Sequence, residues 1–431
     1  MEPFYEFLRR ANHSVKPHQE AGVKWSLDAE RNGHLVDGTL IRGGFIADEM
    51  GLGKTNQMIG TCLCNPKCRT LIVLPRALLE QWTTVIQETL RHEPIVFHGY
   101  QKRDVTLNDL HHAPFVLTTY GMLSEPKKVG LTNLLHDVAW ERVIFDEAHH
   151  LRNKNTAVYR GAKKLNAGIR WLVTGTPIQN KKSDFFHLCA VLGVSSKDPL
   201  LPEQIMLRRT KAEAGVVLPA LREHSNQVRW QNTQEAKLAR RYHEVVEGVP
   251  NQIVRLLRAR QTCVMPALVD RAIGTTSKLD RVVAQLQANA SNGRAKLVFC
   301  HFRGEIDAIH ARLTRQRVAL FDGRVKSSDR KAILSEPVDV LLCQIQTGCE
   351  GLNLQQFDEV YFVSPHWNPA VEDQAVARCH RIGQQNTVDV YRFYMDELGE
   401  ETASMDVHVR DVQDAKRGLA DELIMEKPLP L

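Results

Sequence analysis

The stretch Ala47–Thr55, ADEMGLGKT, has the residue types of a loop that binds phosphate groups. Gly51 and Gly53 can adopt positive φ, which lets successive backbone N–H groups converge on phosphate oxygens. Lys54 would then reach the β- and γ-phosphates of a nucleoside triphosphate, and the Thr55 hydroxyl would ligate Mg²⁺. The stretch lies between an apolar run, GGFIA, and a helical pattern, as such a loop requires.

Asp48 departs from the usual G-x-x-x-x-G-K-[ST] pattern, because it stands where that pattern has its first glycine. Aspartate is among the few residues other than glycine that enter the left-handed backbone region at modest cost. We therefore expect Asp48 to be accommodated there, with its charge directed away from the phosphates. Taken alone, the stretch is equally consistent with a chance Gly-Lys-Thr that binds no nucleotide.

The sequence VIFDEAHH supplies a second part of the same chemistry. It ends an apolar run with Asp146 and Glu147, which the pattern places at the carboxyl end of a strand. One carboxylate there can hold Mg²⁺, and its neighbour can orient and deprotonate an attacking water molecule. Acidic pairs are common on protein surfaces, but a pair at a strand end downstream of a Gly-Lys-Thr predicts hydrolysis of a nucleoside triphosphate.

A third group of polar residues lies far downstream, in DQAVARCHRIGQ (373–384). The pattern places Gln374, Arg378 and Arg381 on a helix, and the two arginines, three residues apart, share one face. An arginine that faces the γ-phosphate compensates the charge that develops during phosphoryl transfer. The alternative for these residues is a solvated basic helix.

The elements that must position these residues follow a repeated rhythm of apolar runs and helical patterns. Near-continuous apolar runs predict strands that are buried on both faces of parallel sheets. The first set comprises residues 70–75, 94–99, 114–120, 142–148 and 170–176. The second set begins at about residue 296 and comprises KLVFCHF, VALFDG, DVLLCQI, EVYFVSP and TVDVYRFY. The sequence therefore predicts an α/β fold with two mostly parallel sheets flanked by helices.

The chain length also favours two domains, because 431 residues exceed an ordinary single core. We expect an N-terminal lobe over residues 1–206 and a C-terminal lobe over residues 276–400. The segment 207–275 is charged and mostly helical in pattern, which predicts a linker and a short helical insertion. Residues 401–431 are predicted to form a helix and a tail.

The composition narrows the classes of function. The chain is 43% hydrophobic and 25% charged, and its net charge of +6 permits an anionic partner without requiring one. It has no apolar run of about eighteen residues and no apolar secretory core near its start, so we expect no membrane partner and no signal peptide. Among nine cysteines only Cys62, Cys64 and Cys68 cluster, without a second pair at zinc-site spacing. We therefore expect reduced thiols and no zinc site.

Taken in order, the motifs resemble those of the Swi/Snf-like family of DNA-translocating ATPases, within the superfamily-two helicases. The matching stretches are VKPHQEAGVKW (15–25), ADEMGLGKT, DEAHH, LVTGTPIQN (172–180), LRRTK (207–211), FDGRVKSSDR (321–330), QTGCEGLNLQ (346–355), SPHWNPAVEDQ (364–374) and DQAVARCHRIGQ. That family's phosphate loop itself reads D-E-M-G-L-G-K-T, so the resemblance makes Asp48 a normal residue. The resemblance covers about residues 15–395.

The resemblance implies two RecA-like lobes with the ATP site in the cleft between them, and ATP and Mg²⁺ as cofactors. The implied catalytic residues are Lys54, Asp146, Glu147, Arg378 and Arg381, with Thr55 and Asp146 holding the metal. The implied ATP-binding residues are Gln19, which would read adenine, and Asp48, Gly51, Leu52, Gly53, Lys54, Thr55 and Gln374. The residues implied to couple the nucleotide site to the other lobe are His149, Thr174, Gly175 and Thr176.

In this family, loops at strand ends follow the nucleic-acid backbone, and such contacts do not depend on base sequence. The candidates by position for contact with double-stranded DNA are Thr118, Thr119, Arg303, Thr347 and Asn353. Trp82 and Trp367 are predicted to be core residues rather than platforms on which bases stack.

The resemblance implies an ATPase that translocates on double-stranded DNA without separating its strands and that remodels or displaces DNA-bound proteins, in chromatin, repair or transcription. One alternative is a strand-separating DNA or RNA helicase of the same superfamily, against which RCHRIGQ and LRRTK argue. A second is a non-catalytic DNA-binding scaffold, against which the intact Lys54, Glu147 and Arg381 argue.

Some departures limit what the resemblance implies. The stretch 181–206 is shorter than the helical protrusion common in relatives that act on nucleosomes, so nucleosome sliding is not favoured. Nuclear localisation is expected from the resemblance alone, with the cytoplasm or a viral replication site as alternatives. The protein target and the oligomeric state stay open.

Overall fold

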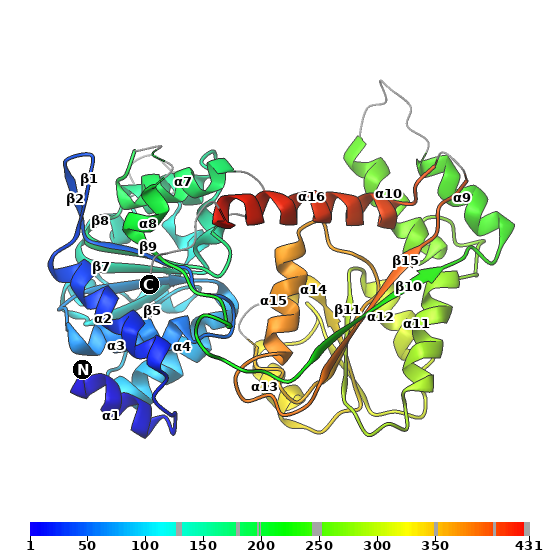
Figure 1. Ribbon diagram of the computed structural model, residues 1–431, viewed down its shortest axis with the longest axis horizontal. Coiled ribbons are helices and arrows are strands. Elements are labelled where there is room, and N and C mark those ends of the chain that lie inside the picture. Colours follow the sequence, from blue (N-terminus) through cyan, green and yellow to red (C-terminus); the bar gives the residue numbers. More distant parts are fainter. Residues whose placement is uncertain are drawn as a thin grey trace. The chain divides into compact units, whose positions relative to one another are not determined.

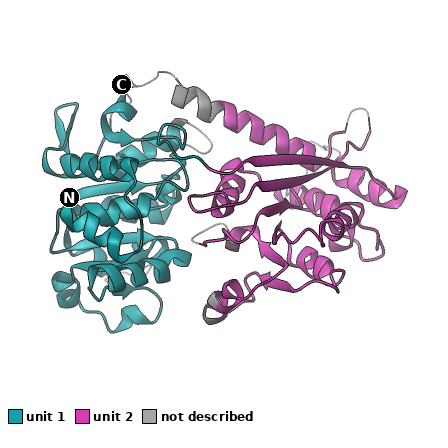
Figure 2. Cartoon of the chain, turned by 60° about the horizontal axis from the view of Figure 1, so that its bottom comes forward, with its two compact units in different colours: residues 1–217, 430 teal, residues 218–429, 431 magenta. Residues whose placement is uncertain are grey.

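The computed structural model describes residues 1–125, 132–177, 182–195, 198, 200–243, 252–348, 352–399 and 402–425. Parts of two motifs, residues 178–180 and 349–351, lie outside the described residues, as does the predicted tail from residue 426. The chain forms two compact units, unit 1 over residues 1–217 and unit 2 over residues 218–429 (Figure 2).

Unit 1 contains a seven-stranded sheet in which every pairing is parallel (Figure 1). The strands lie in the order β5–β6–β4–β7–β8–β3–β9. They are β3 (Gly43–Ile46), β4 (Thr70–Leu74), β5 (Ile95–Phe97), β6 (Phe115–Thr119), β7 (Ala139–Asp146), β8 (Asn166–Val173) and β9 (Met206–Leu207). A separate antiparallel hairpin consists of β1 (His34–Val36) and β2 (Thr39–Ile41). Each strand predicted for this half of the chain is confirmed.

Helices pack on both faces of the unit 1 sheet. One face is covered by α1 (Glu2–Arg10), α2 (Pro17–Arg31), α3 (Lys54–Cys64) and α4 (Leu79–Val85). The other is covered by α5 (Leu107–His112), α6 (Ala157–Lys164), α7 (Lys182–Leu192) and α8 (Leu201–Ile205). Side chains of β4 alternate between the two cores, with Leu71 and Val73 in one and Ile72 and Leu74 in the other. The prediction of strands buried on both faces is therefore confirmed.

Unit 2 contains a six-stranded sheet, also parallel throughout, in the order β10–β15–β14–β11–β13–β12. The strands are β10 (Leu221–Val228), β11 (Lys296–Cys300), β12 (Val318–Phe321), β13 (Val340–Gln344), β14 (Glu359–Phe362) and β15 (Val388–Met395). The helices are α9 (Thr233–His243), α10 (Gln252–Val264), α11 (Ser277–Ala288), α12 (Arg303–His310), α13 (Ser327–Ser335), α14 (Ile345–Gly348), α15 (Pro369–Cys379) and α16 (Met405–Met425). The five strands predicted for this half are confirmed, and the α/β fold with two parallel sheets is that expected.

The strand β10 is a feature that the sequence did not predict, since it lies inside the segment 207–275 expected to be linker and helix. It pairs with β15 over its full length, from Leu221 opposite Val388 to Val228 opposite Met395. Its sequence, LREHSNQV, is polar, and Val228 is its one buried side chain. Because backbone pairing at a sheet edge requires no apolar run, hydrophobic patterning misses such a strand.

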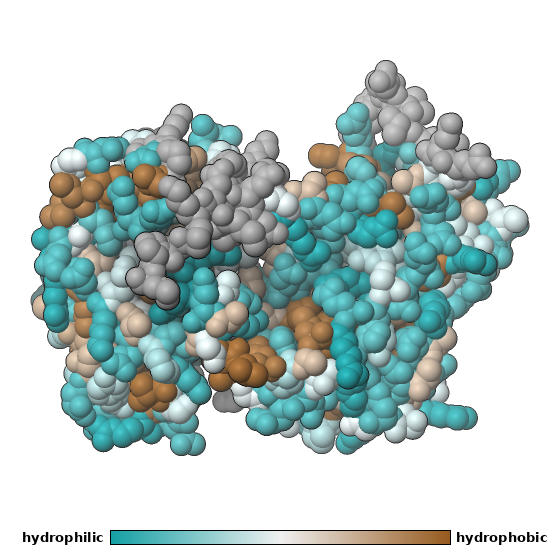
Figure 3. Space-filling view, in the orientation of Figure 1, coloured by the Kyte–Doolittle hydropathy of each residue, from teal (hydrophilic) through white to brown (hydrophobic). Residues whose placement is uncertain are grey.

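The surface in Figure 3 is largely hydrophilic, with scattered apolar residues. Leu35 and Leu40 are exposed and lie opposite each other on the β1–β2 hairpin. Among the described residues no helix is long and apolar enough to cross a membrane. The cysteines of the described part carry free thiols, and no group of His, Cys, Asp and Glu side chains there is arranged to hold a metal ion by itself.

Candidate active site

The loop between β3 and α3 has the strand–turn–helix context of a phosphate-binding loop. Gly51 has a φ of 91° and Gly53 a φ of 80°, so both glycines adopt the conformations that the sequence predicts for them. Gly53 is the N-cap residue of α3, and no side chain caps this helix end. Gly53 has no side chain with which to cap the first backbone N–H groups of α3, and a helix start of this kind suits an anionic ligand.

The backbone of Asp48 differs from the prediction, because Asp48 is not among the residues with positive φ. Its side chain is fully buried, and its carboxylate accepts hydrogen bonds from Arg209 Nε (3.0 Å), Arg209 Nη2 (2.6 Å) and Gln57 Nε2 (2.8 Å). The predicted left-handed conformation is therefore wrong. An aspartate is tolerated here because a guanidinium neutralises it, and the extra backbone freedom of the first glycine is not used.

Lys54 is the first residue of α3, and its side chain turns back over the loop. Its Nζ donates to the carbonyl oxygens of Asp48 (2.9 Å) and Glu49 (3.4 Å). Gly175, which follows β8, lies next to it, since a Cβ at position 175 would stand 3.2 Å from Lys54 Nζ. The stretch predicted to couple the site to the other lobe thus lies beside the phosphate loop.

Asp146 ends β7, where its side chain is buried. Trp82 Nε1 donates to Asp146 Oδ2 (2.9 Å), and the backbone N–H of Glu147 donates to Oδ1 (3.0 Å). Burial, and then the adjacent Glu147 carboxylate, raise the pKa of Asp146 to about 6, while the Trp82 hydrogen bond and the charge of Lys54 oppose the rise. A further cation near Asp146 would stabilise its ionised form.

Glu147 adopts a left-handed backbone conformation, with φ of 51° and ψ of 50°. Such a conformation costs about 1–3 kcal/mol for a residue other than glycine, and it is concentrated at functional sites. His149 Nδ1 lies 3.5 Å from Glu147 Oε2 and 3.5 Å from Thr174 Oγ1. Thr174 Oγ1 in turn accepts a hydrogen bond from the backbone N–H of Thr176 (3.2 Å). The structure thus links the predicted catalytic carboxylate to the predicted coupling residues.

Gln19 lies on α2 against the phosphate loop. Gln19 Nε2 donates to Leu52 O (3.1 Å), and His18 Nε2 donates to the same oxygen (3.0 Å). A Cβ at Gly53 would stand 2.2 Å from Gln19 Nε2, so the Gln19 amide lies directly against the glycine turn. The residue predicted to read adenine is therefore in contact with the loop that would hold the phosphates.

Three residues that contact this site were not predicted as part of it. Arg209 pairs with Asp48, Trp82 donates to Asp146, and the Tyr120 hydroxyl donates to Asp146 O (2.6 Å). The signal for Arg209 was present in LRRTK, one of the stretches that resemble the family, although no role was predicted for this arginine. Trp82 is 2% exposed, so its assignment to the core is confirmed, but that assignment missed its polar function.

In unit 2, α15 carries Gln374 and Arg378. The helix ends at Cys379, so Arg381 lies in the turn that follows and the prediction of one continuous helical face is wrong in this respect. Gln384 Nε2 donates to the last helical carbonyl, Cys379 O (3.3 Å), which stabilises the helix end. Burial, and then the charge of Arg378, lower the pKa of Arg381.

Two family models match the chain, one in each unit. The SNF2-related domain matches residues 18–200, and the helicase conserved C-terminal domain matches residues 277–383. The chain therefore combines an SNF2-related domain with a helicase conserved C-terminal domain, as SNF2-family helicase-like ATPases do. This outcome confirms the family expected from the motifs.

The SNF2-related chain is similar to viral, bacterial and vertebrate proteins. It is 29% identical to the probable global transactivator of Orgyia pseudotsugata multicapsid polyhedrosis virus, over 88% of this chain and 86% of the relative. It is 27% identical to an uncharacterized ATP-dependent helicase of Mycoplasma genitalium and to the chromodomain-helicase-DNA-binding protein 1-like of Danio rerio. In both cases the match covers 96% of this chain but only 42% and 44% of the relative. Among solved structures it matches the Sulfolobus solfataricus SWI2/SNF2 ATPase core in complex with dsDNA, at 22% identity and a TM-score of 0.44, over 97% of this chain and 98% of that one.

The residues of this SNF2-related chain that are predicted to contact DNA have unequal access to solvent. Thr118 is fully buried and its hydroxyl donates to Phe97 O (2.8 Å), while Thr119 Oγ1 lies 3.0 Å from His98 Nδ1. Arg303, at the start of α12, and Asn353 are exposed, and Thr347, on α14, is half-buried. The unit 2 residues therefore offer more surface to a nucleic acid than the two threonines do.

The residues around the phosphate loop suit ATP and Mg²⁺. Lys54 Nζ is held by carbonyl oxygens, which are weaker acceptors than phosphate. Burial and the adjacent Glu147 carboxylate raise the pKa of Asp146, and a divalent cation held there would offset both effects. Thr55, on the first turn of α3, provides a hydroxyl next to Lys54.

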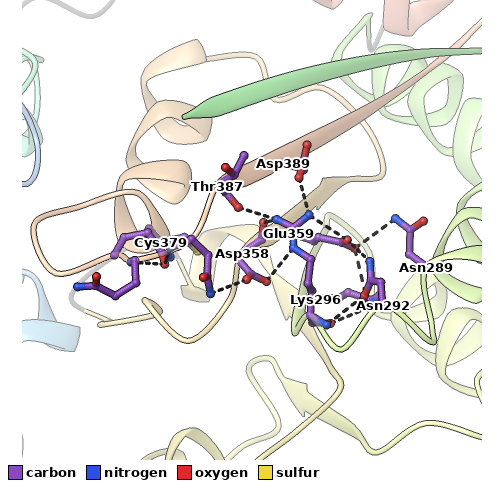
Figure 4. Close-up of polar contacts among 12 residues, drawn as sticks. Asn289, Asn292, Lys296, Asp358, Glu359, Cys379, Thr387 and Asp389 are labelled. Atoms are coloured by element: carbon purple, nitrogen blue, oxygen red, sulfur yellow. Dashed lines mark hydrogen bonds and ion pairs between the residues drawn. The ribbon is translucent and has the colours of Figure 1, made fainter. Parts of the chain in front are cut away.

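A different polar cluster lies in unit 2 (Figure 4). Arg294 donates to Asp389 Oδ2 (2.5 Å), Asp358 O (2.6 Å) and Thr387 O (2.6 Å). Glu359 accepts from Asn292 Nδ2 (2.6 Å) and lies close to the Lys296 ammonium group. Because its charges are paired where β11, β14 and β15 begin, this cluster is best explained as support for the sheet.

Proposed function

We propose that this chain is an ATP-driven translocase on double-stranded DNA that displaces or remodels DNA-bound proteins without separating the strands. The observation that carries the proposal is the juxtaposition, at the carboxyl ends of β3, β7 and β8, of Lys54, Asp146 and the strained Glu147. Lysine and adjacent carboxylates around a loop of this kind suit phosphoryl transfer to water.

ATP would be held by the amino end of α3, by Lys54 and, on the adenine side, by Gln19. Thr55 and Asp146 would hold Mg²⁺, which neutralises charge on the phosphates when it is bound. Glu147 would orient the attacking water and accept its proton, and its backbone conformation fixes the direction of its carboxylate. His149 would keep that carboxylate in place and connect it to Thr174.

The arginines of unit 2 would supply the remaining positive charge that the phosphates of ATP require. Unit 1 supplies Lys54 to the phosphates, and a guanidinium from Arg378 or Arg381 would compensate the charge that develops on the γ-phosphate. Because that chemistry is divided between two units, each cycle of hydrolysis would be accompanied by a conformational change in which one unit moves relative to the other. If both units bind DNA, this conformational change would move the protein along the duplex.

The contacts with DNA would be made to its backbone and would not depend on base sequence. Exposed Arg303 and Asn353 and half-buried Thr347 are the candidates that the structure favours. Thr118 and Thr119 would act through the loop that follows β6 rather than through their own hydroxyls. The nucleus is the proposed location, and a viral replication site is the alternative.

The proposal is tested by measuring ATP hydrolysis with no polymer, with duplex DNA, with single-stranded DNA and with RNA, for the wild type and for Glu147→Gln. Stimulation by duplex DNA, lost in the variant and unaccompanied by strand separation, supports the translocase. Preference for single strands or RNA supports a strand-separating helicase. A wild type that binds DNA but hydrolyses no ATP supports a scaffold and overturns the proposal.

A further inference from the structure

The segment between β9 and β10, residues 208–220, joins the two units and is called the connector below. Each of its ends is held by contacts within one unit. In unit 1 it forms hydrogen bonds with the phosphate loop. In unit 2 it forms a hydrogen bond with His380, which directly precedes Arg381. The inference that follows rests on the proposed ATPase function.

The unit 1 end of the connector extends the parallel pairing of β9 with β3 along the phosphate loop. The backbone N–H of Ala47 donates to Leu207 O (2.8 Å), and that of Glu49 donates to Arg209 O (2.8 Å). The side chain of Glu49 accepts from the backbone N–H of Lys211 (2.8 Å) and pairs with its ammonium group (3.0 Å). The loop residues before the first glycine are thus held by the connector.

Arg209 is the strongest part of this anchor. Its guanidinium forms a fork on the fully buried Asp48 and also donates to His18 O (2.6 Å) and Gln57 Oε1 (3.2 Å). Gly22 leaves room for this arrangement, because a Cβ there would stand 1.9 Å from Gln57 Oε1 and 3.0 Å from Arg209 Nη2. Arg209 therefore joins the phosphate loop, α2 and the connector in one buried network.

The unit 2 end of the connector is held by His380. His380 Nε2 donates to Pro219 O (2.7 Å), since a carbonyl oxygen can only accept. The next residue, Ala220, accepts from the backbone N–H of Val388 (2.9 Å), where the pairing of β10 with β15 begins. His380 is the C-cap residue of α15 and directly precedes Arg381.

We propose that the connector transmits the state of the phosphate loop to the arginines of unit 2, with Arg209 and His380 as positioning residues at its two anchors. Between the anchors, Thr210 and Glu213 close a turn through the hydrogen bond from Thr210 N to Glu213 Oε2 (2.6 Å), and Val217 is 94% exposed. A displacement of residues 47–49 is therefore passed to residues 207–211, and through them along a short segment to the turn that carries Arg381.

The first test uses hydrogen–deuterium exchange without nucleotide and requires no activity. Arg209→Lys keeps the charge but loses the fork on Asp48. We expect exchange at residues 47–53 to rise by at least about tenfold, because the loop then opens locally without unfolding of the unit. Arg222→Lys, at an exposed position of β10, is the matched control and should leave the loop unchanged. Unchanged exchange in Arg209→Lys overturns the anchor, and a rise throughout unit 1 indicates a merely structural role.

The second test is a double-mutant cycle on DNA-stimulated turnover. Arg209→Lys and His380→Phe should each reduce turnover by about tenfold, and His380→Gln, which restores a donor, should recover most of the loss. Residues in different units that share no partner have additive effects, so independent roles predict about a hundredfold loss for the double variant. If both act through the connector, the double variant should be no slower than the slower single variant. A hundredfold loss, or no loss in either single variant, overturns the inference.

A third test uses a variant in which neither anchor residue is replaced, so that misfolding at an anchor cannot explain its result. Insertion of Gly-Ser-Gly-Ser after the exposed Val217 leaves both anchors intact and lengthens the path between them. Nucleotide binding should stay within about threefold of wild type, while DNA-stimulated turnover falls by about tenfold, because a flexible insertion relaxes transmission at little cost in stability. Wild-type turnover in this variant overturns transmission. An inert wild-type protein would overturn the proposed function instead, and the exchange measurement would still decide the Arg209 anchor.

Discussion

The strand β7 carries a buried charged side chain in its first half and another at its last residue, and the two side chains have different kinds of hydrogen-bond partner. Toward the start, Arg142 forms a fork on Glu30 (2.6 and 2.5 Å), and Glu30 also accepts from Trp171 Nε1 (2.8 Å) and Asn65 Nδ2 (2.6 Å). At the other end of the strand, Asp146 accepts hydrogen bonds from the indole of Trp82 and from the backbone N–H of Glu147. The neighbouring carboxylate of Glu147 carries a charge of the same sign as that of Asp146.

This difference distinguishes a buried charge that stabilises the fold from a buried charge that is a candidate for binding a ligand. The buried carboxylate of Glu30 is surrounded by donors that include a cation, so it fixes α2 against the sheet and has no capacity for a further ligand. Asp146 is also buried, but it accepts these hydrogen bonds from uncharged donors, and burial together with the adjacent Glu147 carboxylate raises its pKa. Arg381 is its counterpart of opposite sign in unit 2, since burial and the neighbouring Arg378 lower its pKa. Charges left without full compensation are those expected to meet a ligand.

The largest expected effect is on turnover in Arg381→Ala. If Arg381 contacts the γ-phosphate, the variant should bind ATP but lose DNA-stimulated turnover by at least about 10³-fold. Its melting temperature should not fall, because the substitution removes a partly buried cation next to Arg378. Steady-state hydrolysis and differential scanning fluorimetry measure the two quantities, with the exposed Arg315→Ala as control. Retained turnover would exclude Arg381 from this role.

The next effect is on stability at the other end of β7. Arg142→Met leaves Glu30 buried without its cation, and the free energy of unfolding should fall by about 3–5 kcal/mol. Urea denaturation measures the loss. Replacing both partners, in Arg142→Met with Glu30→Leu, should recover most of it, because no unpaired charge remains. A loss below about 1 kcal/mol in the single variant would contradict the supporting role of this pair.

A smaller effect concerns the pH dependence of stability at Asp146. Because the folded-state pKa is raised to about 6, this group favours the folded state below its unfolded value near 3.9, and that contribution is lost as the pH rises through 6. Asp146→Asn should therefore be more stable than wild type at pH 8, by at most about 3 kcal/mol, and the difference should shrink toward pH 4. Thermal unfolding at a series of pH values, without nucleotide or Mg²⁺, measures it. A difference that does not vary with pH would contradict the assignment.

The smallest effect is expected for Trp82→Phe, which removes one hydrogen bond from Asp146. The free energy of unfolding should fall by about 1 kcal/mol. Above pH 6 the loss should be greater than at pH 4, because the indole stabilises the ionised carboxylate. Trp140→Phe is the matched control, since Trp140 Nε1 donates to an uncharged acceptor, Leu135 O (2.9 Å). Equal pH profiles for the two variants would remove Trp82 from the site.

Much of the fold could be predicted from the sequence, because parallel strands buried on both faces are continuous apolar runs. The strand β10 could not be predicted in this way, since its pairing depends on the backbone of β15 and not on its own side chains. The end of α15 was also missed. Arg378 and Arg381 have helical spacing, but the hydrogen bonds of His380 and Gln384 turn the chain after Cys379.

The parts of the candidate site that are built from residues adjacent in the sequence could be predicted. The contacts between residues far apart in the sequence could not. The glycine turn, Lys54 and the Asp146–Glu147 pair follow from local pattern and the chemistry of phosphate. The partner of Asp48 does not, because Arg209 lies far along the chain and reaches it only through the β3–β9 pairing. The sequence DEAHH does not indicate the left-handed backbone conformation of Glu147 either.

The position of β10 at the edge of the unit 2 sheet decides how the protein can be divided for expression. A fragment that began at residue 276 would lose β10 and leave the backbone of Val388–Met395 without its partner on that side. Open edges of this kind attach to other copies of themselves and drive aggregation. A fragment that begins at residue 218 keeps the polar strand as a cover, so the sequence that looks most like a dispensable linker is what would keep the isolated half soluble.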